Sequence, residues 1–299
     1  MMRRLDEVVE AARKRGPARV AIAAAHDPDV IEAMKKAGEL GLAEGIFVGD
    51  RAKILSLAEG AGWTIPDAQI VDEPDEPVAV RKAIALVRDR SAGLLMKGKV
   101  KTSALMKAVL DRETGLRGGR LFSQVIVFQV PGIDRLMLMS DAAINIAPNL
   151  EQKADLCRNA IEVAHALGIA EPKVALLCGL EFVNPDMPAT LDAAALTMMN
   201  RRGQITGAYV EGPIALDVPL SNFAADRKGI VSPLVEQTDI FIPPDIEAAN
   251  ILYRAILYFA KGESGGVVMG AKVPLILLSR AETPETKIHS IAIGILMTK

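Results

Sequence analysis

Polar side chains able to bind an anion or a thioester follow apolar runs in the last third of the chain. Asp245 comes shortly after one such run, and Asn250 opens the helical pattern that follows it. Ser279 and Arg280 directly follow another apolar run. In an open α/β sheet, strand carboxyl ends and helix amino ends meet at a ligand crevice. These residues therefore predict a binding site.

Arg280 and Ser279 offer complementary chemistry. A guanidinium can bind phosphate oxygens with two parallel hydrogen bonds or stabilise a developing oxyanion. The Ser279 hydroxyl can hydrogen-bond a thiol or thiolate, but no Gly-x-Ser-x-Gly elbow surrounds it, so we do not interpret it as a covalent nucleophile. The alternative interpretation is a turn serine beside a solvated arginine.

A second candidate site follows the apolar run that ends at Met96. Lys97, Gly98 and Thr102 stand where a strand is predicted to give way to a helix, and Lys107 comes one turn later. Backbone amides, a helix dipole and ammonium groups would together bind an anion there. The Walker A order is absent, so NTP hydrolysis is not predicted. A solvated lysine cluster beside an ordinary helix cap at Thr102 is the alternative.

Other polar residues carry less specific signals. Asn250 could be a satisfied helix cap, and the carboxylates of Glu211 and Asp217 could be structural. His26 is the one histidine near the expected crevice, although a loop histidine beside a helix cap is the favoured interpretation. His165 is expected at the surface.

Composition excludes several classes of protein. The sequence has 35 Lys and Arg against 37 Asp and Glu, a net charge of −2, which leaves no basic footprint for nucleic acid. Two cysteines without Cys-x-x-Cys spacing argue against a disulfide framework or a zinc cluster and fit a reducing cytoplasm. No secretion signal is evident at the start. The longest apolar run is far shorter than the ~20 residues that span a bilayer.

Short apolar runs alternate with amphipathic helical patterns, which predicts an α/β fold of mostly parallel sheets in two lobes. Residues 19–25 predict a buried strand, followed by an N-cap at Asp27 with proline at the first helical position. Residues 125–130 and 136–139 predict an antiparallel pair around a Pro-Gly turn.

The predicted first lobe comprises residues 1–141 and 268–299, and the second comprises residues 142–267. The helix after Pro284 has apolar residues at helical spacing, so we expect it to bury one face against the first lobe.

Several motifs, taken in their order along the chain, resemble the phosphate acetyl/butyryltransferase family. Their residues are most similar to its phosphate butyryltransferase branch. The motifs are Lys97-Gly98 with Thr102, Ser140-Asp141-Ala142-Ala143-Ile144-Asn145, Glu211-Gly212-Pro213 with Asp217, Lys228-Gly229, Pro244-Asp245 to Asn250, and Gly270 to Arg280. The resemblance implies two lobes of isocitrate/isopropylmalate dehydrogenase-like architecture, a cleft between them for CoA and phosphate, and a homodimer or larger assembly.

By the same resemblance, Ser279 would contact the CoA sulfur and Arg280 would bind the acyl phosphate or its oxyanion. Acetyltransferase relatives have an aspartate seven positions after the serine, where this chain has Thr286, so Glu285 is the nearest carboxylate that could act as a base.

The remaining expected sites also come from the resemblance. The corner formed by Lys97, Gly98 and Thr102 would hold phosphate, and Lys107 would supply the cation that relatives take from an arginine. The residues expected to line the CoA cleft are Asp245, Asn250, Gly270 and Lys272.

The implied reaction is reversible transfer of a short acyl group (butanoyl, propanoyl or acetyl) between CoA and inorganic phosphate, without a covalent enzyme intermediate. CoA is then a substrate, and no permanent cofactor, metal, nucleic acid or membrane partner is expected. Two alternatives remain open: an NAD(P)- and metal-dependent decarboxylating dehydrogenase on the same fold, and a non-catalytic acyl-CoA-binding protein.

Overall fold

The structure is a computed structural model that describes residues 1–277 and 282–298. The chain forms two compact units. The central unit contains residues 1–5 and 121–264, and the N-terminal unit contains residues 6–120 and 265–299. Both are mostly parallel α/β structures, which confirms the predicted fold class.

The N-terminal unit is built from six strands and six helices among the residues described. The strands are β1 (Ala18–Ala23), β2 (Ala43–Gly49), β3 (Ile70–Asp72), β4 (Leu94–Lys97), β10 (Glu263–Met269, which starts in the central unit) and β11 (Leu275–Ile276). The helices are α1 (Leu5–Lys14), α2 (Pro28–Glu39), α3 (Arg51–Gly60), α4 (Glu76–Arg88), α5 (Thr102–Val109) and α10 (Pro284–Met297).

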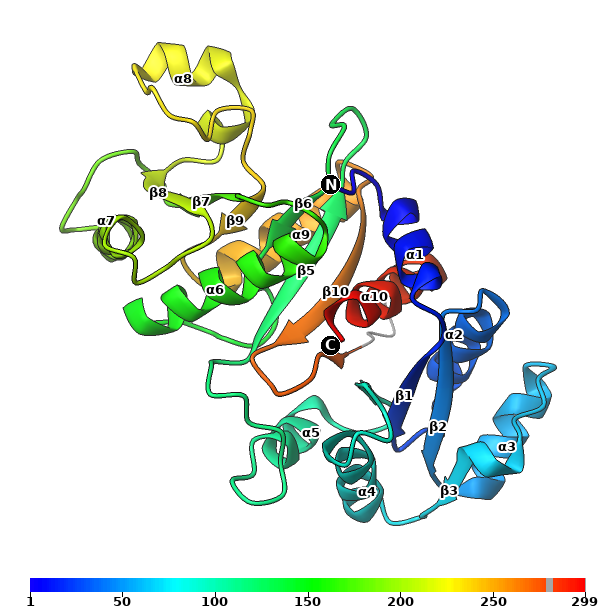
Figure 1. The fold of residues 1–299 in the computed structure, drawn as a ribbon. Helices are drawn as coiled ribbons and strands as arrows, with labels where there is room; N and C mark the ends of the chain where they lie inside the picture. Colours follow the sequence, from blue (N-terminus) through cyan, green and yellow to red (C-terminus); the bar gives the residue numbers. More distant parts are fainter. Residues whose placement is uncertain (278–281, 299) are drawn as a thin grey trace. The chain divides into compact units, whose positions relative to one another are not determined.

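Strand order in the N-terminal unit is β3-β2-β1-β4-β11-β10, with β10 alone antiparallel to its neighbour. Figure 1 shows β1 and β2 side by side, with α2 and α3 following them. The chain moves from β1 to β2 to β3 in one direction and then crosses back past β1 to β4. Because such crossovers are right-handed, α2 and α3 lie on one face and α4 on the other. Helix α5 packs beside α4. The connections therefore leave β1 and β4 toward opposite faces, which makes their carboxyl ends a topological switch point.

Helix α2 begins where the sequence predicts, with Asp27 as the N-cap. The Asp27 side chain accepts a hydrogen bond from the Asp29 amide, and Pro28 occupies the first turn. The proline has no amide hydrogen to leave unsatisfied there, so it stabilises the helix start.

The central unit contains five strands and four helices in its described residues. The strands are β5 (Ser123–Gln129), β6 (Met137–Met139), β7 (Lys173–Leu177), β8 (Tyr209–Ile214) and β9 (Ile240–Ile242), and the helices are α6 (Leu150–Ala166), α7 (Pro188–Arg201), α8 (Asn222–Lys228) and α9 (Ile246–Tyr258). Strands β5 and β6 form the predicted antiparallel pair.

Strand order in the central unit is β5-β6-β9-β7-β8, and β6, β9, β7 and β8 are parallel. Helices α8 and α9 cover the face that carries Phe128, Met139 and Phe241. Leu176 points to the other face, where it meets α6 and α7. Figure 1 shows α6 and α9 beside the strands of this unit. The connections leave β6 and β9 toward opposite faces, so a second switch point lies at their carboxyl ends.

Two features differ from the sequence-based expectations. The units divide at residues 120/121 and 264/265, rather than at 141/142 and 267/268, because β5 and β6 pack into the core of the central unit through residues such as Phe128 and Met139. Helix α10 is buried on nearly all sides rather than on one face, since it packs on both α2 and β11. Among the described residues, none of the helices combines the length and hydropathy needed to cross a membrane.

Candidate active site

The corner after β4 is locked onto the turn after β1. The Gly98 amide donates to the Ala23 carbonyl at 2.9 Å, and the Lys99 amide donates to the Ala24 carbonyl at 2.7 Å. A Cβ atom on Gly98 would lie 2.2 Å from the Ala24 oxygen, so only glycine fits. Ala24 itself has a φ of 53°, a left-handed conformation that costs a non-glycine residue about 1–3 kcal/mol. Strain of this kind, held by close packing at a switch point, is typical of functional sites.

The lysines of this corner are not gathered as the sequence suggests. The half-buried Lys97 ammonium turns back and donates to the carbonyls of Gly98 and Val100 at 3.0 and 3.3 Å. Helix α5 then begins at the exposed Thr102, with Lys101 as an N-cap that makes no side-chain capping bond. The first turn of α5 has no acidic residue, which leaves the positive end of the helix dipole uncompensated.

Lys107 lies apart from the corner, on the rim of a groove between α4 and α5. The groove has a volume of about 670 Å³. Its apolar lining includes Ile84 and Ala104, and Arg81 stands on the rim with Lys107. Lys107 is therefore a groove cation rather than a member of the backbone corner.

The second switch point is organised by Asp141, which is 3% exposed. Its carboxylate accepts from the amides of Ala143, Ile144 and Asn145 at 2.9 to 3.2 Å, and from the Asn145 side chain at 2.6 Å. Burial raises the pKa of Asp141, and these four hydrogen bonds oppose that rise. The loop of residues 140–145 is thereby held rigid at the end of β6.

Asp245 and Asn250 both join the second switch point. The Asp245 carboxylate caps α9 by accepting from the Ala248 amide at 2.8 Å. The Asn250 side chain donates to the Ala142 carbonyl at 3.1 Å and ties α9 to the Asp141 loop. Sequence reasoning placed these two residues at a crevice and included Asp141 in a family motif, but it assigned the Asp141 carboxylate no role at that crevice.

Gly270 and Lys272 lie at the other end of the N-terminal unit's sheet. They form the turn before β11, and the Lys272 amide donates to the Leu116 carbonyl at 2.8 Å. Because β11 runs parallel to β4, residues before β11 lie at the amino ends of these strands. The structure thus separates Gly270 and Lys272 from the corner at Gly98.

Ser279 and Arg280 lie outside the described residues. The last paired residue before them, Ile276, stands opposite Met96 in β4, one residue before Lys97. Glu285 is exposed in the first turn of α10, and the hydroxyl of the buried Thr286 lies 3.2 Å from that of Thr283.

Glu211 and Asp217 are engaged in local networks of the central unit. Glu211 accepts hydrogen bonds from the hydroxyls of Tyr209 and Ser232. Lys228 pairs with both Asp217 and Glu181, at 2.8 and 2.6 Å. These contacts support the structural interpretation of both carboxylates.

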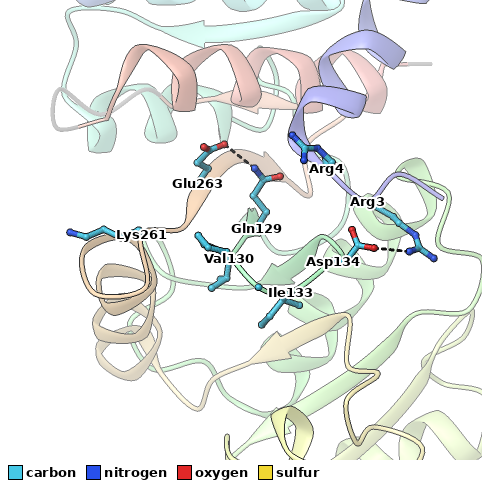
Figure 2. Close-up of a pocket in the computed structure, with 10 residues that line it drawn as sticks. Arg3, Arg4, Gln129, Val130, Ile133, Asp134, Lys261 and Glu263 are labelled. Atoms are coloured by element: carbon cyan, nitrogen blue, oxygen red, sulfur yellow. Dashed lines mark hydrogen bonds and ion pairs between the residues drawn. The ribbon is translucent and has the colours of Figure 1, made fainter.

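A further cavity of about 360 Å³ lies at the turn between β5 and β6 in the central unit. Figure 2 shows Arg3 pointing to Asp134 and Gln129 pointing to Glu263 in its lining. Since β5 is antiparallel to β6, this turn lies at the amino end of β6, away from the Asp141 loop. The position argues against a role in the predicted site. In residues 1–277 and 282–298, no group of three or more His, Cys, Asp or Glu side chains is arranged to hold a metal ion.

Comparison of the sequence with known protein families gives a match over most of the chain. The family model described as phosphate acetyl/butaryl transferase matches residues 76–295, which is more than half of the chain. The chain belongs to this family. It is accordingly an acyltransferase.

Individual relatives of the family cover nearly all of the chain. It is 41% identical to the phosphate butyryltransferase of Clostridium acetobutylicum, over 99% of both chains. It is 44% identical to the phosphate acetyltransferase of Thermotoga maritima, over 97% of this chain and 98% of the other. The solved structure of a branched-chain phosphotransacylase from Enterococcus faecalis superposes with a TM-score of 0.80 at 30% identity, covering 94% of this chain and 98% of the other.

Proposed function

We propose that this acyltransferase moves a short acyl group reversibly between CoA and inorganic phosphate: acyl-CoA and phosphate give acyl phosphate and CoA. The support is near full-length similarity to enzymes named phosphate butyryltransferase and phosphate acetyltransferase. Butanoyl, propanoyl and acetyl groups are the proposed acyl groups. CoA is proposed as a substrate, with no permanently bound cofactor.

The observation that carries the proposal is the backbone corner at Gly98. The corner lies at a topological switch point and packs against the strained turn at Ala24. The first turn of α5, which follows the corner, has no acidic residue, so its positive end suits a phosphate group. We assign Lys97, Gly98 and Thr102 to the phosphate subsite through this corner. Lys107 contributes a positive charge from the α4/α5 groove.

In the direction of acyl-CoA synthesis, the CoA thiolate attacks the carbonyl carbon of the acyl phosphate. A C–S bond forms, the carbonyl π electrons move to oxygen, and the tetrahedral intermediate then breaks its C–O bond to release phosphate. The thiol proton passes to a base, for which Glu285 is our assignment. Phosphate is a good leaving group, so cationic stabilisation of the oxyanion contributes more than acid assistance.

The remaining residue assignments follow the sequence motifs. Arg280 would stabilise the oxyanion and bind phosphate, and Ser279 would hydrogen-bond the sulfur. Ile276, which precedes them, pairs with Met96 of β4, one residue before Lys97. Asp245 and Asn250 support CoA binding by holding the second switch point. Gly270 and Lys272 would contact CoA only if it extends to the amino end of β11.

The test is release of CoA thiol from butanoyl-, propanoyl- and acetyl-CoA with and without phosphate. Phosphate-dependent release supports the proposal, whereas release without phosphate, or none, would reject it. A dehydrogenase would instead reduce a nicotinamide cofactor, and a non-catalytic binding protein would bind acyl-CoA without turnover.

Arg280→Ala should lower kcat/KM by about 10²- to 10³-fold, the usual cost of removing one oxyanion donor. The control is Arg13→Ala on α1, which removes an arginine that is 59% exposed and pairs only loosely with Glu10, at 3.7 Å. Equal activity of the two variants would remove Arg280 from the site.

We further propose a homodimer in the cytoplasm. Exposed apolar side chains on α9 and at its C-cap support self-association, since Ile251, Tyr258 and Phe259 are 70%, 62% and 88% exposed. Light scattering of the purified protein should give twice the chain mass, and Phe259→Ser should weaken the dimer. A monomer at micromolar concentration would refute this part of the proposal.

A further inference from the structure

His26 stands at the first switch point on a fixed piece of backbone. It comes two residues after the strained Ala24, whose carbonyl accepts from the Lys99 amide. On either side of His26, the Ala25 amide donates to the Val48 carbonyl and the Asp27 amide donates to the Ala25 carbonyl, each at 2.9 Å. The backbone that carries the imidazole is therefore held by main-chain hydrogen bonds to β2 and to the corner after β4.

The two ring nitrogens of His26 have different surroundings. Nδ1 is buried, and the described residues provide it with no hydrogen-bond partner. It lies close to the backbone of Gly49, where an added Cβ would be 3.2 Å away. A buried N–H without an acceptor costs more than a buried lone pair without a donor, so the proton belongs on Nε2. The tautomer with Nε2–H is the one that this environment stabilises.

Charged groups from three elements act on the ring. Burial lowers the pKa of His26, and the ammonium groups of Lys53 and Lys99 lower it further, while the carboxylates of Asp50 and Glu76 oppose them. His26 is thus neutral near pH 7 and keeps one N–H to donate, at Nε2. Its buried Nδ1 cannot reach a substrate proton, and a base role for Nε2 would require the Nδ1–H tautomer, which this environment disfavours.

We propose that His26 is a catalytic residue that donates a hydrogen bond from Nε2 to an oxygen of the phosphate group during acyl transfer. The inference rests on the proposed function. The half-buried ring, the Lys99 ammonium and the Gly98 corner share one switch point, so a phosphate oxygen placed there meets a neutral donor and a cation together.

The first test measures the tautomer directly. Nitrogen-15 NMR of histidine-labelled wild-type enzyme, without substrate and near pH 7, should show a protonated Nε2 and an unprotonated Nδ1 for His26. Assignment comes from the spectrum of His26→Gln. A protonated Nδ1 would overturn the proposal.

The second test measures kinetics in the CoA-release assay. His26→Ala should lower kcat/KM for phosphate by about 10- to 100-fold, as expected for one hydrogen bond to a charged group. The KM for acyl-CoA should stay nearly unchanged. His26→Gln should recover most of the loss, because the glutamine amide can donate from nearly the same place as Nε2.

The control is His165→Ala, which removes an exposed histidine of α6 that hydrogen-bonds the Gly207 carbonyl within the central unit. If His26→Ala has the kcat/KM for phosphate of wild type, and CoA release by wild type depends on phosphate, this inference fails and the proposed function stands. If wild type itself shows no dependence on phosphate, the proposed function fails. If His26→Ala does not fold, His26→Gln and the NMR measurement still decide. A folded His26→Gln variant whose kcat/KM for phosphate falls by the full factor of about 10 to 100 would count against the proposal.

Discussion

Replacing Gly98 by alanine tests whether the corner after β4 is as closely packed as the structure indicates. The new Cβ would lie 2.2 Å from the Ala24 oxygen and 2.7 Å from the Ala23 oxygen. Ordinary contacts begin near 3.4 Å, so the corner must separate by about 1 Å. All of the nearest atoms belong to the main chain, so no side-chain rotation can relieve the contact.

The expected cost combines overpacking with weakened hydrogen bonds. Overpacking costs about 1–3 kcal/mol. Separation also weakens the bonds from the Gly98 and Lys99 amides, each worth about 0.5–1.5 kcal/mol. A total of about 2 to 6 kcal/mol follows, the upper end applying if both bonds are lost. At about 2–4 °C per kcal/mol, Tm should fall by roughly 4 to 24 °C.

Circular dichroism melting measures the fall in Tm, and the CoA-release assay should show a loss of kcat/KM for phosphate. The matched control is Gly60→Ala at the end of α3, where an added Cβ meets nothing within 4 Å. That variant should be neutral or more stable by up to about 1 kcal/mol. A Gly98→Ala protein with the Tm and the kcat/KM for phosphate of wild type would refute the close packing of the corner.

Three other predictions concern the second switch point and the thiols. Burial raises the pKa of Asp141 above 3.8, so the folded state holds this proton more tightly than the unfolded state does; its contribution to stability is greatest below 3.8 and falls as pH rises to the folded pKa. Urea unfolding from about pH 4 to about pH 7 should show this fall in wild type relative to Asp141→Asn, and parallel curves would contradict it. Asp245→Ala removes the cap of α9 and should lower the free energy of unfolding by about 0.5–2 kcal/mol, whereas Asp245→Asn should keep most of it. Lost CoA binding without lost stability would assign Asp245 a ligand role instead. Burial raises the pKa of Cys157 to about 12 and that of Cys178 to about 11, so both thiols stay protonated at about pH 8 and should react slowly with a thiol reagent until urea unfolds the protein. Equal rates in folded and unfolded protein would refute this.

The elements that sequence reasoning predicted well are those with local signals. The start of α2 follows from Asp27 and Pro28, whose capping and fixed φ act within one turn. The β5 and β6 pair follows from two apolar runs around a Pro-Gly turn. The surface position of His165 follows from its place opposite the apolar stripe of α6.

Predictions that needed contacts between distant segments were less complete. The burial of α10 on nearly all sides depends on α2 and β11, neither of which its own periodicity can reveal. The Lys97 ammonium was expected to face an anion, but it contacts the carbonyls of Gly98 and Val100 because the corner folds back on itself. Gly270 and Lys272 belong to the same sequence motif as Ser279 and Arg280. In the structure, however, Gly270 and Lys272 lie at the amino end of β11.

By itself, the sequence determined the alternation of strands and helices, the family and the strand-to-helix corners where function was sought. These are properties of short segments, in which capping, periodicity and turn chemistry act between near neighbours. Only the tertiary structure decided which corners share an edge, because strand order is set by crossovers between residues far apart in the chain. The juxtaposition of His26 with the Gly98 corner exists because β1 pairs with β4, which comes some seventy residues later.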